Sequence, residues 1–203
     1  MQRISALVLL LAAPIFCSGE EEVSSNPVVV MEITDGKIVL ELNSAEAPVT
    51  VENFLKYVDA GFYNGTIFHR VIPNFVAQGG GYSPDFEEKE TGDPIENEST
   101  NGLSNLRGTI AMARTGDPHS ATAQFYINLV DNTRLDYREE TQSWGYTVFG
   151  TVIEGMAVVD SIAEIPRGPG GPFAQDVPFR PVIINKAYRM TEETESEKRS
   201  AEE

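Results

Sequence analysis

The most informative part of this sequence is Phe68-His69-Arg70-Val71-Ile72-Pro73-Asn74-Phe75-Val76-Ala77-Gln78-Gly79-Gly80. Side chains alternate along a strand, so Arg70 is expected on the same side as Phe68 and Ile72, opposite His69 and Val71. A half-buried arginine with no nearby carboxylate is costly. Either Arg70 finds an anion elsewhere, as in a surface salt bridge, or it is held as a hydrogen-bond donor over an apolar floor.

The chain on both sides of this stretch has mainly the pattern of short strands. Helices are expected from Ala47-Pro48 to Gly61, with a proline in the first turn, and over residues 156–165. Strands are expected over residues 28–33, 37–42, 66–71, 108–113, 124–129, 147–152 and 182–190. Few helices, many strands and no regular βαβ alternation predict a mainly β fold, a closed antiparallel barrel. The glycine- and proline-rich stretch 166–181 is interpreted as a long loop.

The composition of the chain excludes several classes of partner and site. The 203 residues suffice for one good core, and a net charge of -16, from 15 basic and 31 acidic residues, argues against nucleic acid as the partner. One cysteine and two histidines exclude a disulfide framework and an all-protein zinc site. We therefore expect chemistry without a metal or another cofactor, and interpret the widely separated His69 and His119 as structural or solvent-facing residues.

The first 19 residues have the pattern of a secretory signal peptide. Arg3 is the only charged residue before Glu20, and the apolar run 4–17 is shorter than the roughly 20 residues that span a bilayer. We expect export of the protein, with a permanent transmembrane anchor as the weaker alternative. Cys17 offers lipidation as a second alternative, although Pro14-Ile15-Phe16 replace the small residues usual before a lipidated cysteine.

The rest of the chain divides by charge into three parts. Residues 20–27 are an acidic linker, residues 28–190 a folded domain with 22 acidic and 12 basic residues, and residues 191–203 an acidic tail. The two flanks carry too few apolar residues to offset the entropy of ordering, so we expect the tail to be disordered. A basic partner for the tail is an alternative to a role in solubility.

The sequence resembles the cyclophilins, the peptidyl-prolyl cis-trans isomerases, and in particular their bacterial exported type. The resemblance covers roughly residues 29–189 and rests on four blocks in register, which are Phe68 to Gly80, Asn105-Leu106-Arg107-Gly108-Thr109-Ile110-Ala111-Met112-Ala113-Arg114, Gln124-Phe125-Tyr126-Ile127-Asn128 and Tyr146-Thr147-Val148-Phe149-Gly150. It implies a closed eight-stranded antiparallel barrel capped by two α-helices. It also implies a location in the periplasm, with a membrane-tethered lipoprotein through Cys17 as the alternative.

The resemblance also implies an active site. Arg70 matches the catalytic arginine, and Gln78 matches the glutamine that hydrogen-bonds the substrate backbone. The remaining substrate-binding positions are Phe75, Val76, Ala113, Arg114, Gln124, Tyr126, Leu135 and Tyr146. The implied partners are proline-containing peptides and unfolded or folding proteins, bound by a monomer.

Several positions depart from the family pattern. Val76 stands where a methionine is usual, Arg114 where an asparagine is usual, and Tyr146 where the eukaryotic proteins have a histidine. Arg134 occupies the place of a tryptophan that contacts cyclosporin in sensitive members, so weak binding of that drug is expected. Trp144 lies nearby in sequence, in the longer segment 136–145, and does not obviously substitute for it.

Two functions of other classes remain open. These departures are compatible with a proline-peptide-binding module or holdase whose catalysis is vestigial. The second is a small-molecule carrier, which requires a large apolar lumen inside the barrel.

Overall fold

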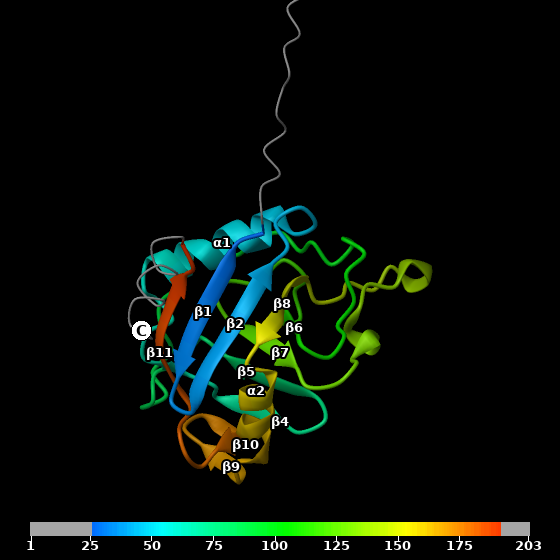
Figure 1. The fold of residues 1–203 in the computed structure, drawn as a ribbon. Helices are drawn as coiled ribbons and strands as arrows, with labels where there is room; N and C mark the ends of the chain where they lie inside the picture. The colour runs from blue at the N-terminus through cyan, green and yellow to red at the C-terminus, as the bar shows by residue number, and fades with distance from the viewer. Residues whose placement is uncertain (1–25, 192–203) are drawn as a thin grey trace, which may run out of the picture.

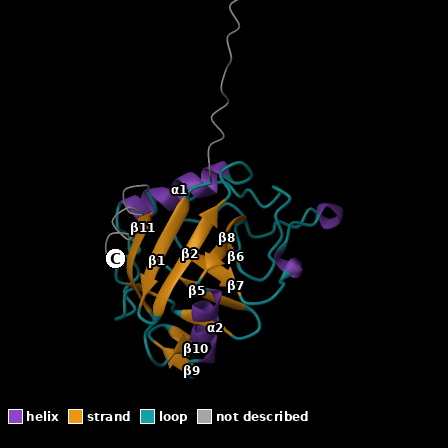
Figure 2. Ribbon diagram, in the orientation of Figure 1, coloured by secondary structure: helices purple, strands orange, loops and turns teal. Residues whose placement is uncertain are grey.

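The computed structural model describes residues 26–191 and contains two α-helices, two 3-10 helices and a curled sheet (Figure 1, Figure 2). The elements are β1 (Val28–Ile33), β2 (Gly36–Leu42), α1 (Pro48–Asp59), β3 (Thr66–Ile67), β4 (Arg70–Ile72), β5 (Val76–Gly79), β6 (Thr109–Met112), β7 (Phe125–Asn128), η1 (Thr133–Leu135), η2 (Glu139–Thr141), β8 (Val148–Glu154), α2 (Met156–Glu164), β9 (Arg167–Gly170), β10 (Phe173–Pro178) and β11 (Ile183–Arg189). The predictions for the signal peptide, Cys17, most of the acidic linker and the tail lie outside the described residues.

The main sheet has nine strands in the order β3-β11-β1-β2-β8-β6-β7-β5-β4, and all its neighbours are antiparallel. The prediction of a mainly β fold with two α-helices is confirmed. The single strand expected over residues 66–71 is instead divided into β3 and β4, which stand at opposite ends of the order. The hydrogen-bonded sheet is therefore a strongly curled half-barrel, and its closure into eight strands stays a prediction.

The division at Phe68 and His69 also changes which way the side chains point. Phe68 is 1% exposed and belongs to the inner core together with Val71, so the expected grouping of Phe68 with Arg70 is wrong. Strict alternation holds only within an unbroken strand, and the chain leaves the strand conformation between β3 and β4.

The stretch 166–181, expected to be a loop, contains the separate hairpin β9–β10. Its glycines and prolines hide the strand signal, because neither residue type contributes to an alternating pattern. A glycine is needed at position 170, because a Cβ there would lie 2.8 Å from the Val177 side chain of the partner strand. The hairpin packs beside β4 and so borders the stretch that contains Arg70.

Both helices pack on the curled sheet near opposite ends of its strands (Figure 1). Helix α1 begins at Pro48 and buries its expected stripe, Val51, Phe54, Leu55 and Val58, while Gly61 follows its end with φ +64°. Helix α2 contacts β2, β4 and β5. Within residues 26–191, no helix is long and apolar enough to cross a bilayer.

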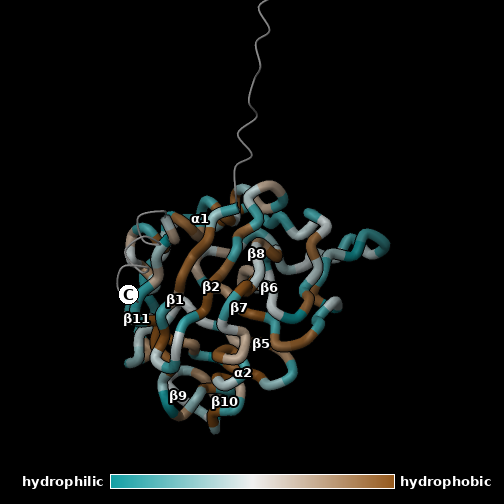
Figure 3. Tube along the Cα trace, in the orientation of Figure 1, coloured by the Kyte–Doolittle hydropathy of each residue, from teal (hydrophilic) through white to brown (hydrophobic). Residues whose placement is uncertain are grey.

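The two faces of the sheet carry different clusters of apolar side chains. The inner face joins the helices in the main core, and brown, hydrophobic positions follow strands such as β1 in Figure 3. On the outer face a second, smaller cluster combines buried Val76, Ala111, Tyr126 and Val148 with the partly buried residues Phe75, Leu103, Ala113, Leu135 and Tyr146. Most of the predicted site residues belong to this outer cluster.

Candidate active site

A row of directly opposed residues crosses the outer face. Arg70 of β4 lies opposite Gln78 of β5, Gln78 opposite Tyr126 of β7, and Tyr126 opposite Ala111 of β6. Directly opposed residues in antiparallel strands share one face, so the register alone brings Arg70, Gln78 and Tyr126 together. The sheet thus aligns a cation and an amide with an aromatic ring that is far away in sequence.

This row borders an outer-face pocket of about 180 Å³. Its lining consists of nine of the ten predicted site residues, namely Arg70, Phe75, Val76, Gln78, Ala113, Arg114, Tyr126, Leu135 and Tyr146. The tenth, Gln124, is not in the lining but contacts Gln78 directly. The sequence-predicted residues therefore meet at one place, while their individual roles remain predictions.

The turn between β4 and β5 places Phe75 in the pocket. Ile72 pairs with Val76, so the turn spans Pro73, Asn74 and Phe75. Asn74 has φ 57°, a left-handed conformation that asparagine tolerates better than most residues. The Phe75 carbonyl accepts hydrogen bonds from the Leu129 N–H and the Asn132 side chain, both at 2.9 Å, which fixes the turn against the segment after β7.

The Arg70 guanidinium is oriented by a chain of two amides. Arg70 Nη1 donates to Gln78 Oε1 at 3.2 Å, and Gln78 Nε2 donates to Gln124 Oε1 at 3.1 Å. Gln124 fits beside Gly81 because that residue has no Cβ, which would lie 2.5 Å from the Gln124 side chain. Gln124 thus positions Gln78, and Gln78 positions Arg70.

A buried asparagine network lies behind the pocket wall, and the sequence did not point to it. Tyr126 Oη donates to Asn105 Oδ1 at 2.7 Å, and the same oxygen accepts from Asn128 at 3.2 Å. The Asn105 amide donates to Asp136 Oδ1 at 2.8 Å, and Asn128 Oδ1 accepts from Asn132 at 2.8 Å. The available signal was Asn128 itself, a polar residue inside an apolar strand.

The environment of Tyr126 keeps its hydroxyl protonated. Burial raises the pKa of Tyr126 well above its usual value, Tyr146 and Asp136 raise it further, and Arg114 lowers it in part. The neutral hydroxyl is therefore available as the donor to Asn105, and the ring presents an apolar surface to the pocket.

Arg114 lines the pocket, and its side chain makes several contacts there. Its guanidinium stacks over the Tyr146 ring, 4.4 Å from the centroid. It also donates to three carbonyls, those of Thr115 at 2.9 Å, Trp144 at 2.9 Å and Gly145 at 3.2 Å. These bonds tie the segment 136–145 to the pocket.

Arg134 lies beside the pocket, with its guanidinium 4.6 Å from the centre of the Phe75 ring. Trp144 does not line the pocket; it packs near Tyr137 and His119, with ring centroids 6.0 and 5.0 Å away. The two residues thus differ in their relation to the site, and Arg134 is the one in contact with its apolar floor.

His69 is next to Arg70 in sequence but takes no part in the pocket. It is 1% exposed and lies between Tyr82 and Phe173, with ring centroids at 4.7 and 5.2 Å. Within residues 26–191 its Nδ1 has no hydrogen-bond partner at normal geometry. Burial lowers the pKa of His69 to about 4; the nearby Arg70 charge lowers it as well, and a hydrogen bond with the Ile67 backbone opposes both. His69 is neutral at pH 7.

The pocket combines an apolar cradle with a fixed cationic donor at its edge. Among the described residues no group of three or more His, Cys, Asp or Glu side chains is placed to hold a metal ion. The lining contains no serine, cysteine or carboxylate that could act as a nucleophile or general base. The arrangement suits binding an apolar ring while a charged hydrogen bond acts on an atom next to it.

Comparison with known proteins finds relatives of one family. Residues 28–189 match the family model described as cyclophilin type peptidyl-prolyl cis-trans isomerase/CLD. The chain is 56% identical over 160 residues to the peptidyl-prolyl cis-trans isomerase cyp18 of Streptomyces antibioticus, covering 78% of this chain and 96% of the relative. It is 47% identical over 184 residues to peptidyl-prolyl cis-trans isomerase A of Dickeya dadantii, covering 91% and 95%.

A solved structure shares the fold. The crystal structure of a Cryptosporidium parvum cyclophilin type peptidyl-prolyl cis-trans isomerase, in the presence of the dipeptide Ala-Pro, matches with a TM-score of 0.62 and 23% sequence identity. The match covers 81% of this chain and 99% of the other.

Proposed function

This chain belongs to the cyclophilin-type peptidyl-prolyl cis-trans isomerase family, and we propose that its outer-face pocket accelerates X-Pro isomerisation in exported proteins, with Arg70 as the catalytic residue. The observation that carries the proposal is the oriented guanidinium of Arg70, held by Gln78 at 3.2 Å at the edge of an apolar pocket of about 180 Å³. Phe75, Val76, Tyr126 and Leu135 surround the proline ring in this proposal.

The proposed mechanism needs no covalent bond to break. Rotation about an X-Pro bond disrupts amide resonance and faces a barrier of about 18–20 kcal/mol. In the twisted state the proline nitrogen becomes pyramidal and regains a lone pair. A donor aimed at that nitrogen binds the twisted state more tightly than either planar isomer, and this difference lowers the barrier. Lowering it by about 7 kcal/mol speeds the exchange roughly 10⁵-fold.

Arginine suits this role. Arg70 keeps its proton at every relevant pH, so it donates without a partner to take or return a proton. In the proposed complex Gln78 and the backbone near Ala113 hold the peptide on either side of the proline. The uncatalysed step takes tens to hundreds of seconds, slow enough to limit the folding of an exported chain.

Isomerisation of an Ala-Pro peptide tests the proposal. We expect the wild-type protein to exceed the uncatalysed rate, and Arg70→Ala to lose most of the rate while retaining much of the peptide binding. A wild-type protein that binds the peptide but gives no rate above background overturns the proposal in favour of a binding module.

We also propose that the curled sheet is sealed into an eight-stranded barrel through residues 66–72. The support is that β3 pairs with β11 and β4 with β5, with only Phe68 and His69 between the two strands. The Phe68 N–H donates to the Val182 carbonyl at 3.0 Å, which extends the pairing of β3 with β11 toward β4. Hydrogen exchange of this amide is expected to be as slow as that of the central strands; exchange at the rate of a surface loop contradicts closure.

The location proposed for the protein is the periplasm. It is supported by the sequence of residues 1–19, and lipidation at Cys17 with tethering to a membrane is the alternative. The mass of the mature protein distinguishes them, because acylation adds a lipid to Cys17 and simple cleavage adds nothing. A mature protein that retains residues 1–16 contradicts both forms of the proposal.

The protein is further proposed to act as a monomer and to bind cyclosporin weakly. The second part depends on Arg134, which stands in place of the tryptophan of sensitive family members. Tight, nanomolar inhibition of the purified protein by cyclosporin contradicts it.

A further inference from the structure

Three arginines lie at or beside the outer-face pocket, and none of them has an ion-pair partner among the described residues. Elsewhere in the described residues, Arg107, Arg167, Arg180 and Arg189 each lie within 4.0 Å of an aspartate. Within residues 26–191, no carboxylate lies at that distance from Arg70, Arg114 or Arg134. The folded domain carries 22 acidic and 12 basic residues, so a cationic pocket rim stands out against its acidic surroundings.

Asp136 lies behind the pocket wall, and its oxygens already accept hydrogen bonds from neighbouring residues. Asp136 accepts from the Asn105 N–H at 2.7 Å and the Asn105 amide at 2.8 Å, and also from the Ser104 hydroxyl. The pocket lining itself contains no acidic residue. With no acidic residue among the described lining residues and no ion pair on the three guanidinium groups within residues 26–191, the rim is positive.

The three arginines differ in how many of their donors are free. Arg114 spends its Nε, Nη1 and Nη2 groups on three carbonyls, and Arg70 directs Nη1 to Gln78. Arg134 is exposed, and in the described part of the chain its guanidinium donates no hydrogen bond.

Stacking leaves the donors of Arg134 accessible. A guanidinium that lies over a ring keeps its N–H groups in its own plane, where they match the two oxygens of a carboxylate. The Phe75 ring, 4.6 Å from the Arg134 guanidinium carbon, belongs to the pocket lining. A carboxylate bound there therefore lies within a residue or two of the proline in the pocket.

We propose that Arg134 forms an anion subsite beside the outer-face pocket, and that it selects X-Pro bonds flanked by an aspartate or glutamate side chain. This inference rests on the proposed isomerase function and names its preferred substrate class. Arg70 and Arg114 add to the attraction through their charge, and Arg134 supplies the free donors.

Matched peptides test the subsite. One series places glutamate or glutamine directly before the proline, and a second series places it directly after. Exposed ion pairs are weak, so we expect the kcat/KM ratio of the glutamate to the glutamine peptide to reach about two- to fivefold in at least one series at low salt. Raising the salt to about 1 M is expected to reduce the ratio toward one.

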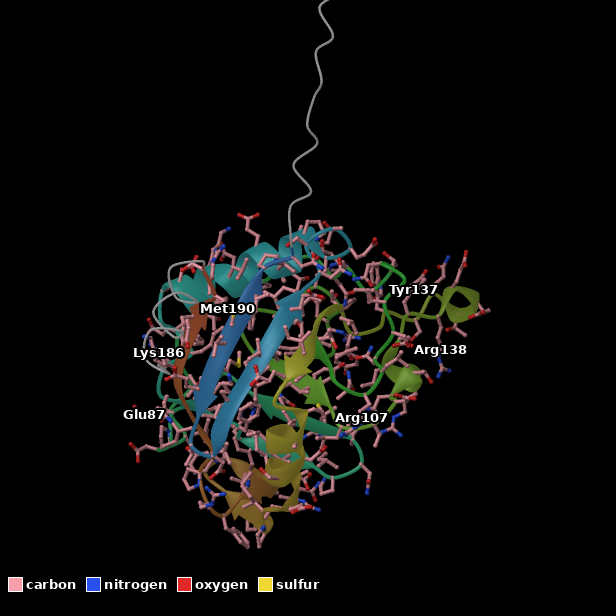
Figure 4. All side chains as sticks on the ribbon, in the orientation of Figure 1. Glu87, Arg107, Tyr137, Arg138, Lys186 and Met190 are labelled. Atoms are coloured by element: carbon pink, nitrogen blue, oxygen red, sulfur yellow. The ribbon has the colours of Figure 1, made fainter. Side chains whose placement is uncertain are left out.

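Variants assign the preference to Arg134. Arg134→Gln is expected to bring the ratio to about one, and Arg134→Lys to retain part of it, since the charge stays and the planar fork is lost. Arg138→Gln is the matched control, because Arg138 is also exposed and without an ion pair in the described chain, but lies on the projecting segment shown in Figure 4. This control is expected to keep the wild-type ratio.

The outcomes separate this inference from the function on which it rests. A wild-type ratio near one in both series, or an unchanged ratio in Arg134→Gln, overturns the subsite while isomerisation of the glutamine peptide upholds the function. If no peptide is isomerised, the function fails, and equilibrium binding of the same peptides decides the subsite: tighter binding of the glutamate peptide that Arg134→Gln abolishes supports it, and equal binding overturns it.

Discussion

Strands β4, β5 and β7 present different chemistry on their inner and outer faces. On the inner face, Val71, Ala77 and Ile127 are at most 1% exposed and pack in the main core. Their neighbours Arg70, Gln78 and Tyr126 point to the outer face. There Gln78 accepts a hydrogen bond from Arg70, and Tyr126 forms part of the pocket wall. Because the side chains alternate, a substitution on one face can change stability and a substitution one residue away can change activity.

The largest expected effect on stability is on the inner face. Phe125 packs edge-on against Phe54, Tyr63 and Phe68, with ring centroids 5.5 to 5.9 Å apart. Phe125→Ala removes these contacts and leaves a cavity, so the free energy of unfolding should fall by about 4 kcal/mol in urea denaturation. For Phe125→Leu, the free energy of unfolding should fall by about 1 kcal/mol, and kcat/KM should stay within about threefold of the wild type. A loss below about 1 kcal/mol for Phe125→Ala contradicts the role given to this face.

The next effect concerns His69, which is buried although its neighbour Arg70 faces the pocket. Its pKa of about 4 in the folded protein lies below the usual 6.5, so the unfolded chain binds the proton more readily. The contribution of neutral His69 to the free energy of unfolding is fully present above about pH 6.5. It is lost as the pH falls toward 4, and the loss amounts to at most about 3 kcal/mol.

Unfolding free energies measured between pH 7 and pH 4 check this expectation. His69→Gln should flatten the pH dependence in that window relative to the wild type. An equal slope in wild type and His69→Gln shows that other groups cause the acid sensitivity.

A smaller effect is expected from the network behind the pocket wall. Asn105→Ala leaves Tyr126 Oη and the Asn128 amide without their shared acceptor, so the free energy of unfolding should fall by about 2 kcal/mol. The Tyr126 ring loses its anchor, and we expect a rise in KM for the Ala-Pro peptide that exceeds the change in kcat. A purely structural role predicts unchanged kinetics per folded molecule, and that result removes Asn105 from the positioning of the site.

The smallest effect is expected for Tyr126→Phe. It removes one donor but keeps the ring in the wall, and Asn105 Oδ1 still accepts from Asn128. The loss should be about 1 kcal/mol in unfolding free energy, with kcat/KM within about threefold of wild type. A tenfold loss of kcat/KM contradicts the view that the ring, rather than the hydroxyl, faces the substrate.

Features with a local sequence signal, or with a motif, could be predicted from the sequence. Alternation and the proline at Pro48 located β1, β2 and α1, and the four blocks in register located the pocket lining. The hairpin β9–β10 was missed because its glycines and prolines carry no alternation, and the orientation of Phe68 was missed because the strand breaks there.

Other features depend on tertiary partners that no sequence pattern specifies. The acceptor of Tyr126 Oη is Asn105, which lies 21 residues away, and the ring beneath Arg134 is Phe75, on a different turn. The Arg114 side chain lies over the Tyr146 ring and donates to the Trp144 and Gly145 carbonyls, which holds the segment 136–145. Such contacts follow from how the loops fold back on the sheet, so only the folded structure reveals them.

The most direct test compares two adjacent residues of β4, one on each face, in the same two assays. Arg70→Ala should lose about 100-fold in kcat/KM for an Ala-Pro peptide, with less than about 1 kcal/mol lost in unfolding free energy. Val71→Ala should lose about 2 kcal/mol in unfolding free energy and keep kcat/KM within about threefold. An Arg70→Ala protein that isomerises the peptide at the wild-type rate contradicts the assignment of catalysis to the outer face.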